Sequence, residues 1–136
     1  MIENRDLKQA NILVVDDEPI NLILMQEYFE DEGFVNVTYM RDSVMGFEFY
    51  KSQDVDMLLL DLKMPDIDGF EFMKKMQGLD KPRPPVLVLT ASADNKTRDR
   101  VLKADAQGVI SKPFNFDVVL LMVEKLIPAY WASGIS

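Results

Sequence analysis

The chain is 136 residues long, with 48% hydrophobic and 28% charged residues and a formal net charge of −8. This size suits one domain with a sizeable core. The acidic balance argues against sequence-independent binding to nucleic acid or to an anionic membrane, which needs a basic surface. The sequence has no cysteine and no histidine. Any nucleophile must therefore be a carboxylate, a hydroxyl or a lysine, and any bound metal is expected to be a hard ion that prefers oxygen ligands.

The first residues are polar and charged, unlike a secretory signal. The longest uninterrupted apolar stretch, residues 118–123, is far too short to span a bilayer. We therefore expect a cytoplasmic protein that makes no contact with membranes.

Five short apolar runs, each bounded by polar residues, predict β-strands that are buried on both faces. They lie at residues 12–15, 35–40, 57–60, 86–89 and 109–110. Amphipathic segments predict helices at about 19–33, 43–50, from about 69, at 95–104, and from after 114 to Pro128, which is expected to end the last helix. A strand followed by a helix, five times in succession, predicts a parallel sheet with helices on both faces.

Polar side chains that could bind a ligand or take part in a reaction follow four of these runs. Asp16 and Asp17 follow the first run, Asp61 ends the third, Thr90 ends the fourth and Lys112 follows the fifth. In open α/β sheets ligands bind beyond the carboxyl ends of the strands, so these side chains are expected to meet at one edge. Two carboxylates about 4 Å apart repel by roughly 4 kcal/mol at an effective dielectric constant near 20, which favours recruitment of a cation such as Mg²⁺.

Each of these residues also has an ordinary structural explanation. An Asp pair before Pro19 is often a helix cap, an Asp or Thr at a strand end is often a turn or cap residue, and a Lys before a proline is usually a solvated surface residue. The combination favours a functional site, because several independent explanations would otherwise have to coincide.

Four segments make the chain resemble the receiver domains of two-component response regulators. They are residues 12–19 (ILVVDDEP), 58–73 (LLLDLKMPDIDGFEFM), 86–92 (VLVLTAS) and 109–114 (VISKPF). The resemblance spans about residues 11–127 and implies a doubly wound α/β fold of the flavodoxin-like type, with five parallel strands in the order 2-1-3-4-5. We expect an N-terminal extension at 1–10, a receiver domain at 11–129, and a tail or truncated linker at 130–136.

The resemblance also implies the roles of residues at the acidic edge. Asp61 matches the aspartate that accepts a phosphoryl group. Asp17 matches a direct magnesium ligand and Asp16 its neighbour, which often acts through water. Asp61 itself and the backbone carbonyl of Lys63 are expected to complete the protein's ligands for Mg²⁺, which Mn²⁺ can replace.

Other positions match residues that respond to the phosphoryl group. Thr90 and Lys112 are expected to contact its oxygens, and the bond between Lys112 and Pro113 is expected to be cis. Lys63 and Ser92 occupy positions that tune hydrolysis of the acyl phosphate. Val109 stands where the family often has a switching aromatic ring, so a switch that depends on Thr90 is expected here without that ring.

By this resemblance the chain is a signalling switch and no free-standing enzyme, although it catalyses its own phosphorylation and dephosphorylation. The donor is expected to be a histidine kinase or a histidine phosphotransfer protein, because a phosphohistidine must come from outside this sequence. The signal is expected to alter a surface of the fourth helix, fifth strand and fifth helix. That surface is expected to serve a homodimer or an output domain, with no direct binding to nucleic acid.

Two helices are more apolar than their core-facing positions require. In the first helix Leu24, Met25, Tyr28 and Phe29 are expected to face the core, and a further set extends beyond them. The predicted partner surface consists of Ile20, Leu22 and Ile23 in the first helix, and Pro113, Phe114, Phe116, Leu121 and Met122 at the fifth. Burial under a tail around residues 130–131 is the alternative explanation for the fifth helix.

Two other functions are compatible with parts of this pattern. A magnesium-dependent phosphohydrolase of the haloacid-dehalogenase type requires a second Asp two positions after its nucleophile, but Glu18 stands two positions after Asp16. A degenerate receiver that acts only as a binding module is expected to lack one of the five site residues, and the sequence lacks none. The preferred hypothesis is therefore a receiver domain phosphorylated on Asp61.

Overall fold

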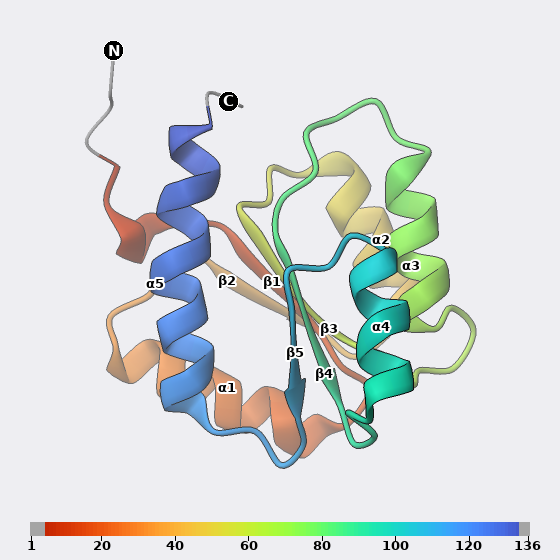
Figure 1. The fold of residues 1–136 in the computed structure, drawn as a ribbon. Coiled ribbons are helices and arrows are strands. Elements are labelled where there is room, and N and C mark those ends of the chain that lie inside the picture. Colours follow the sequence, from red (N-terminus) through yellow and green to blue (C-terminus); the bar gives the residue numbers. More distant parts are fainter. Residues whose placement is uncertain (1–4, 134–136) are drawn as a thin grey trace.

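A computed structural model describes residues 5–133 and shows a five-stranded sheet between two layers of helices (Figure 1). The strands are β1 (Ile12–Val15), β2 (Val37–Met40), β3 (Met57–Asp61), β4 (Val86–Thr90) and β5 (Gly108–Ser111). The helices are a short 3-10 helix η1 (Leu7–Gln9), α1 (Pro19–Asp31), α2 (Ser43–Ser52), α3 (Gly69–Gln77), α4 (Asn95–Lys103) and α5 (Phe116–Ala132). No helix among residues 5–133 is both long and apolar enough to cross a membrane.

All four strand pairs are parallel, and the sheet order is β2-β1-β3-β4-β5. This confirms the predicted fold class and strand order. The order reverses direction at β1, so the connections that leave β1 and β3 pass to opposite faces of the sheet, and a crevice opens between them at the carboxyl ends.

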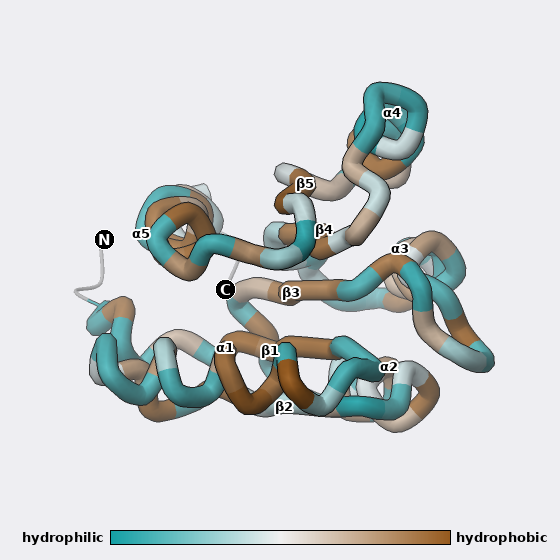
Figure 2. The backbone as a smooth tube through the Cα atoms, turned by 90° about the horizontal axis from the view of Figure 1, so that it is seen from below, coloured by the Kyte–Doolittle hydropathy of each residue, from teal (hydrophilic) through white to brown (hydrophobic). Residues whose placement is uncertain are grey.

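Alternate residues of each central strand point to two separate cores. In β1, Ile12 and Val14 pack with α1 and α5, whereas Leu13 and Val15 pack with α2, α3 and α4. In Figure 2, α1 and α5 lie on one side of the stacked strands and α2, α3 and α4 on the other. The strands are thus buried on both faces, which explains why their sequences are continuous apolar runs.

The structure corrects the predicted core face of α1. Leu22, Met25 and Phe29 are buried, a spacing that places them on one helical stripe, whereas Tyr28 is exposed. Phe116 of α5 is also buried, with its ring packed edge-to-face on Phe29 at a centroid distance of 5.0 Å. The prediction of an exposed partner surface is therefore wrong for Leu22 and Phe116, because both side chains belong to the core.

The predicted end of the last helix at Pro128 is also wrong. Pro128 lies inside α5, and the helix continues to Ala132. An internal proline costs a helix roughly 3 kcal/mol, so the final turn needs support from the rest of the molecule. Trp131 supplies some of it, because its indole Nε1 donates a hydrogen bond of 2.9 Å to Asp56 and its ring lies 5.2 Å from the Arg5 guanidinium. Residues 1–4 of the expected extension and 134–136 of the expected tail lie outside the described residues.

Candidate functional site

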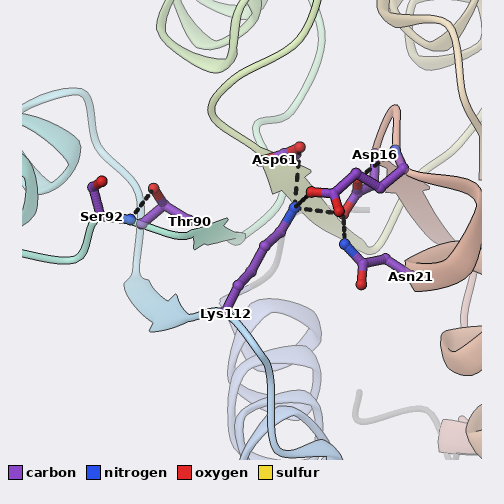
Figure 3. Close-up of polar contacts among 7 residues, drawn as sticks. Asp16, Asn21, Asp61, Thr90, Ser92 and Lys112 are labelled. Carbon is purple, nitrogen blue, oxygen red and sulfur yellow. Dashed lines mark hydrogen bonds and ion pairs between the residues drawn. The ribbon is translucent and has the colours of Figure 1, made fainter.

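The carboxyl ends of β1, β3, β4 and β5 bring the sequence-predicted residues to one edge of the sheet (Figure 3). Asp16 follows β1, Asp61 is the last residue of β3, and Thr90 is the last residue of β4. These three residues and Ser43 are the buried polar or charged residues within 5–133. Burial of carboxylates is costly without partners, so their clustering points to a site with a chemical role.

Lys112 provides the cation at the centre of this edge. Its Nζ lies 3.1 Å from Asp16 Oδ2, 3.1 Å from Asp61 Oδ2 and 3.0 Å from Glu18 Oε1. Its side chain is only 10% exposed. The expected cis peptide bond between Lys112 and Pro113 is present.

Asp16 is held in place by the start of α1. Its Oδ1 accepts a hydrogen bond of 2.9 Å from the Glu18 backbone N–H, and its Oδ2 accepts one of 3.2 Å from Asn21 Nδ2. Glu18 occupies the N-cap position of α1, but its side chain caps no backbone N–H. It turns to Lys112 instead, so the N-terminus of α1 contributes two carboxylates to the site.

The loop after β3 passes close to Asp61. A Cβ atom at Gly69 would lie 2.8 Å from the backbone oxygen of Asp61, so this position tolerates only glycine without a local shift. Gly69 N–H donates to the Leu62 carbonyl at 2.8 Å, and Asp68 caps α3 by accepting from the Glu71 N–H at 2.8 Å. Ser43 Oγ donates to the Pro65 carbonyl at 2.9 Å. These bonds fix the loop that carries Lys63.

Thr90 lies beside the carboxylates without joining their ion pairs. Its Oγ1 accepts a hydrogen bond of 3.1 Å from the Ser92 backbone N–H, as Figure 3 shows. Thr90 and Ser92 line a cleft together with Asp17, Lys63 and Arg100. This cleft lies beside the edge of the sheet that carries Asp61, and Leu62, the next residue, is part of its lining.

The environment changes the proton affinity of the two central groups. Burial is the main cause that raises the pKa of Asp61 to about 7; the charge of Asp16 raises it further, and Lys112 opposes the shift. Burial alone would lower the pKa of Lys112, but the hydrogen bond to Glu18 and the charges of Asp16 and Asp61 raise it overall. The site therefore holds a firmly charged lysine and more carboxylates than one lysine can neutralise.

The carboxylate arrangement fits a hard cation. One oxygen each from Asp16, Glu18 and Asp61 lies within 4.8 Å of the other two, and oxygen ligands of this kind suit Mg²⁺. Asp17 lies outside this group and lines the neighbouring cleft. The predicted roles of Asp17 and of the Lys63 carbonyl as metal ligands stay predictions.

Glu18 and Asn21 are the site residues that sequence reasoning missed. Glu18 follows the Asp pair directly, and Asn21 lies in the first turn of α1, so both were within reach of a search around Asp16. The only available signal was this proximity, because an exposed Glu and an Asn at a helix start are usually solvated.

Comparison with known proteins identifies the family. The family model of the response regulator receiver domain matches residues 12–124. Response regulator SaeR of Staphylococcus epidermidis is 32% identical over 120 residues, covering 87% of this chain and 50% of that protein. A probable transcriptional regulator, ycf29, of Porphyra purpurea is 30% identical over 118 residues, covering 86% and 56%. The chain thus spans about half the length of these relatives.

Solved structures agree with this assignment. A CheY-like response regulator receiver domain protein from Methanospirillum hungatei superposes with a TM-score of 0.83 at 25% identity, covering 92% of this chain and 98% of that one. The receiver domain of a sensor histidine kinase from Pseudomonas aeruginosa, solved with a magnesium ion coordinated in its active-site cleft, has a TM-score of 0.79 at 25% identity, covering 88% and 98%. This chain belongs to the response regulator receiver domain family.

Proposed function

We propose that Asp61 accepts a phosphoryl group and that the chain works as a phosphorylation-dependent signalling switch. The observation that carries this proposal is the contact of 3.1 Å between Lys112 Nζ and the buried carboxylate of Asp61. A buried carboxylate paired with an ammonium group, beside a cleft, combines a nucleophile with a group that stabilises negative charge on the transferring phosphoryl group.

In the proposed reaction an oxygen of Asp61 attacks phosphorus, and the bond from phosphorus to the donor breaks as the new P–O bond forms. The donor's leaving group departs with the electron pair, which gives an acyl phosphate on Asp61. Lys112 neutralises charge on the transferring oxygens. Asp16, Asp17, Asp61 and the Lys63 carbonyl would hold Mg²⁺ or Mn²⁺. When bound, this ion supplies further positive charge for the phosphoryl oxygens.

The phosphoryl group adds nearly two negative charges at neutral pH. The position of Thr90 supports a response to this charge, because its hydroxyl lies at the end of β4 and is bonded only to the Ser92 N–H among the described contacts. Movement of Thr90 toward the new charge would shift the loop between β4 and α4 and bias the surface formed by α4, β5 and α5. Val109, half-buried in β5, stands where the family often has a switching ring, so the proposed switch works without that ring.

The proposed donor is a histidine kinase or a histidine phosphotransfer protein, and the same site would catalyse both phosphorylation and hydrolysis of the acyl phosphate. Lys63 and Ser92 line the cleft, where they would set the access of water to the phosphoryl group. The exposed side chains of Ile20, Ile23 and Leu121, with exposed Pro113 and half-buried Phe114 and Met122, form the proposed partner surface, for a donor, a homodimer or an output domain.

The test is phosphorylation by acetyl phosphate in the presence of Mg²⁺, followed by mass measurement of the intact chain. We expect one phosphoryl adduct on the wild type and none on Asp61→Asn. Asp54→Asn is the matched control, because Asp54 is exposed at the opposite end of β3, and it should be phosphorylated like the wild type. An undiminished adduct on Asp61→Asn, or no adduct on the wild type, would contradict the proposal.

A further inference from the structure

The ammonium group of Lys112 is surrounded by carboxylates. Three of them lie within 3.1 Å of Lys112 Nζ, and among these contacts the one to Glu18 is a hydrogen bond, whereas those to Asp16 and Asp61 are ion pairs. Under the proposed function Lys112 must also donate to an oxygen of the phosphoryl group on Asp61. That oxygen would compete with the present carboxylates for the ammonium group.

The three carboxylates differ in how firmly they are held. Asp16 is 1% exposed and accepts two further hydrogen bonds, from the Glu18 N–H and from Asn21. Asp61 is 5% exposed and is the group on which the phosphoryl oxygens would be built. Release of Asp16 from Lys112 would leave a buried charge poorly compensated, which is expensive.

Glu18 is the exception, because its side chain is 55% exposed. Its ion pair with Lys112 is the contact that the described structure gives its carboxylate. Released from Lys112, that carboxylate would be solvated by water at little cost, as for other exposed ion pairs. Of the three contacts, the one between Lys112 and Glu18 is therefore the cheapest to break.

We infer that Glu18 is a displaceable counter-ion for Lys112, an inference that rests on the proposed function. In the unphosphorylated state Glu18 accepts a hydrogen bond from the Lys112 ammonium, and a phosphoryl oxygen on Asp61 replaces it as the acceptor. Glu18 is a positioning residue that acts through Lys112. Its negative charge competes with the phosphoryl group and so sets how readily Asp61 is modified.

The competing explanation is that Glu18 binds the metal directly, because its oxygen lies within 4.8 Å of oxygens of Asp16 and Asp61. The two explanations predict opposite changes in the phosphorylation rate when the Glu18 carboxylate is removed. Removal of a competing counter-ion speeds phosphorylation and leaves the Mg²⁺ affinity nearly unchanged. Removal of a metal ligand weakens Mg²⁺ binding at least tenfold and slows phosphorylation.

The variant Glu18→Gln separates these explanations, since it removes the charge and keeps the size of the side chain. Exposed ion pairs are worth up to about 1 kcal/mol, so phosphorylation by acetyl phosphate should become roughly two- to fivefold faster. The dissociation constant for Mg²⁺, measured by NMR titration, should change by less than about threefold. Glu27→Gln is the matched control, because it removes the same charge from an exposed position on the same helix, and its rate should equal that of the wild type.

A third measurement needs no phosphoryl transfer. Beryllofluoride with Mg²⁺ mimics a phosphoryl group on a carboxylate, and Glu18→Gln should bind it roughly two- to fivefold more tightly than the wild type. An unchanged or lower rate for Glu18→Gln, with a phosphorylated wild type, would overturn the role of Glu18 and leave the role of Asp61 intact. A wild type that takes up no phosphoryl group would instead contradict the proposed function. In that case beryllofluoride binding alone would test the role of Glu18. Equal affinities of the wild type and Glu18→Gln for beryllofluoride would overturn that role.

Discussion

The two ends of the sheet use charged side chains in opposite ways. At the carboxyl ends the Lys112 ammonium contacts side-chain carboxylates, which can turn to other partners. At the amino ends Lys81 and Arg83 are bonded to backbone carbonyls. Lys81 donates to the carbonyls of Tyr50 and Gln53 at the end of α2, and Arg83 donates to the carbonyl of Met73 in α3 at 3.3 Å and to that of Ala104 after α4 at 2.9 Å.

This difference separates residues that stabilise the fold from residues that determine the reactivity of the site. The last four carbonyls of a helix lack intrahelical partners, so a cation beside the end of α2 or α4 completes the helix and favours its dipole, whereas the Met73 carbonyl lies further inside α3. Loss of a contact of this kind leaves the carbonyl to water and lowers the stability of the fold. The contacts of Lys112 can be exchanged one at a time, as phosphorylation requires. We therefore expect changes at the amino end to alter stability and changes at the carboxyl end to alter reactivity.

The largest expected loss of stability comes from Arg83→Met, which keeps an apolar chain but removes both donors. The free energy of unfolding should fall by about 2–4 kcal/mol, because hydrogen bonds from a charged donor contribute about 1.5–3 kcal/mol each and the two are not fully additive. Urea denaturation measures this fall. Arg41→Met at an exposed position is the control, with an expected change within about 0.5 kcal/mol.

Below the midpoint of its urea transition, Arg83→Met should still be phosphorylated by acetyl phosphate at a rate within about twofold of the wild type. A large drop in rate for the folded variant would show that the amino end also controls the chemistry. The separation between the two ends would then fail.

Asp61→Asn is expected to raise the free energy of unfolding in the absence of metal, in contrast to Arg83→Met. Burial, chiefly, raises the pKa of Asp61 from its ordinary 3.8 to about 7. Between these values the folded chain binds more protons than the unfolded chain, so the free energy of unfolding contributed by Asp61 falls as pH rises from about 4 to 7. Asparagine cannot ionise, and at pH 8 the variant should be more stable than the wild type by about 1–3 kcal/mol.

Urea denaturation at pH 4 and pH 8 tests this sign. The gap between Asp61→Asn and the wild type should nearly vanish at pH 4, where Asp61 is protonated in the folded state. Mg²⁺ at pH 8 should narrow the gap by stabilising the wild type, since a ligand that binds the folded state raises its stability. A gap that does not depend on pH would contradict a raised pKa at this site.

The sequence pattern predicted a parallel sheet with the site residues at one edge for one physical reason, whereas the strand order came from the family resemblance. Strands buried on both faces must be continuous apolar runs, and parallel connections put all their carboxyl ends at one edge. Once the runs that end at Asp61 and Thr90 are recognised, these residues must lie near Asp16 and Lys112. Local patterns were sufficient because the topology leaves few other arrangements.

Local patterns failed where a distant contact decides the outcome. Pro128 is a strong helix breaker in isolation, but the contact of Trp131 with Asp56 supports the helix beyond it. The local sequence predicted that Phe116 is exposed, but its ring packs against Phe29 of α1. A glutamate at the start of a helix is common, so the local sequence does not reveal the partner of Glu18. That partner is Lys112, which lies 94 residues later in the chain.

The smallest expected effect comes from Trp131→Phe at the amino end of β3. The variant keeps an aromatic ring but removes the indole N–H that donates to Asp56, whose other oxygen still accepts from the Asn11 N–H at 2.8 Å. Since Asp56 keeps a partner, the free energy of unfolding should fall by only about 0.5–1.5 kcal/mol. Unfolding should be followed by circular dichroism and not by tryptophan fluorescence, because this substitution removes the only tryptophan of the chain.

Tyr130→Phe, a substitution in the same helical turn, serves as the control and should change stability by less than about 0.5 kcal/mol. The critical measurement is the phosphorylation rate of Trp131→Phe, which we expect to equal that of the wild type. Asp56 and Asp61 lie at opposite ends of β3, and the strand between them is buried on both faces. A slower rate would mean that β3 transmits the loss of the Trp131 contact to Asp61, and that the exchangeable contacts of Lys112 depend on the fixed contacts at the other end.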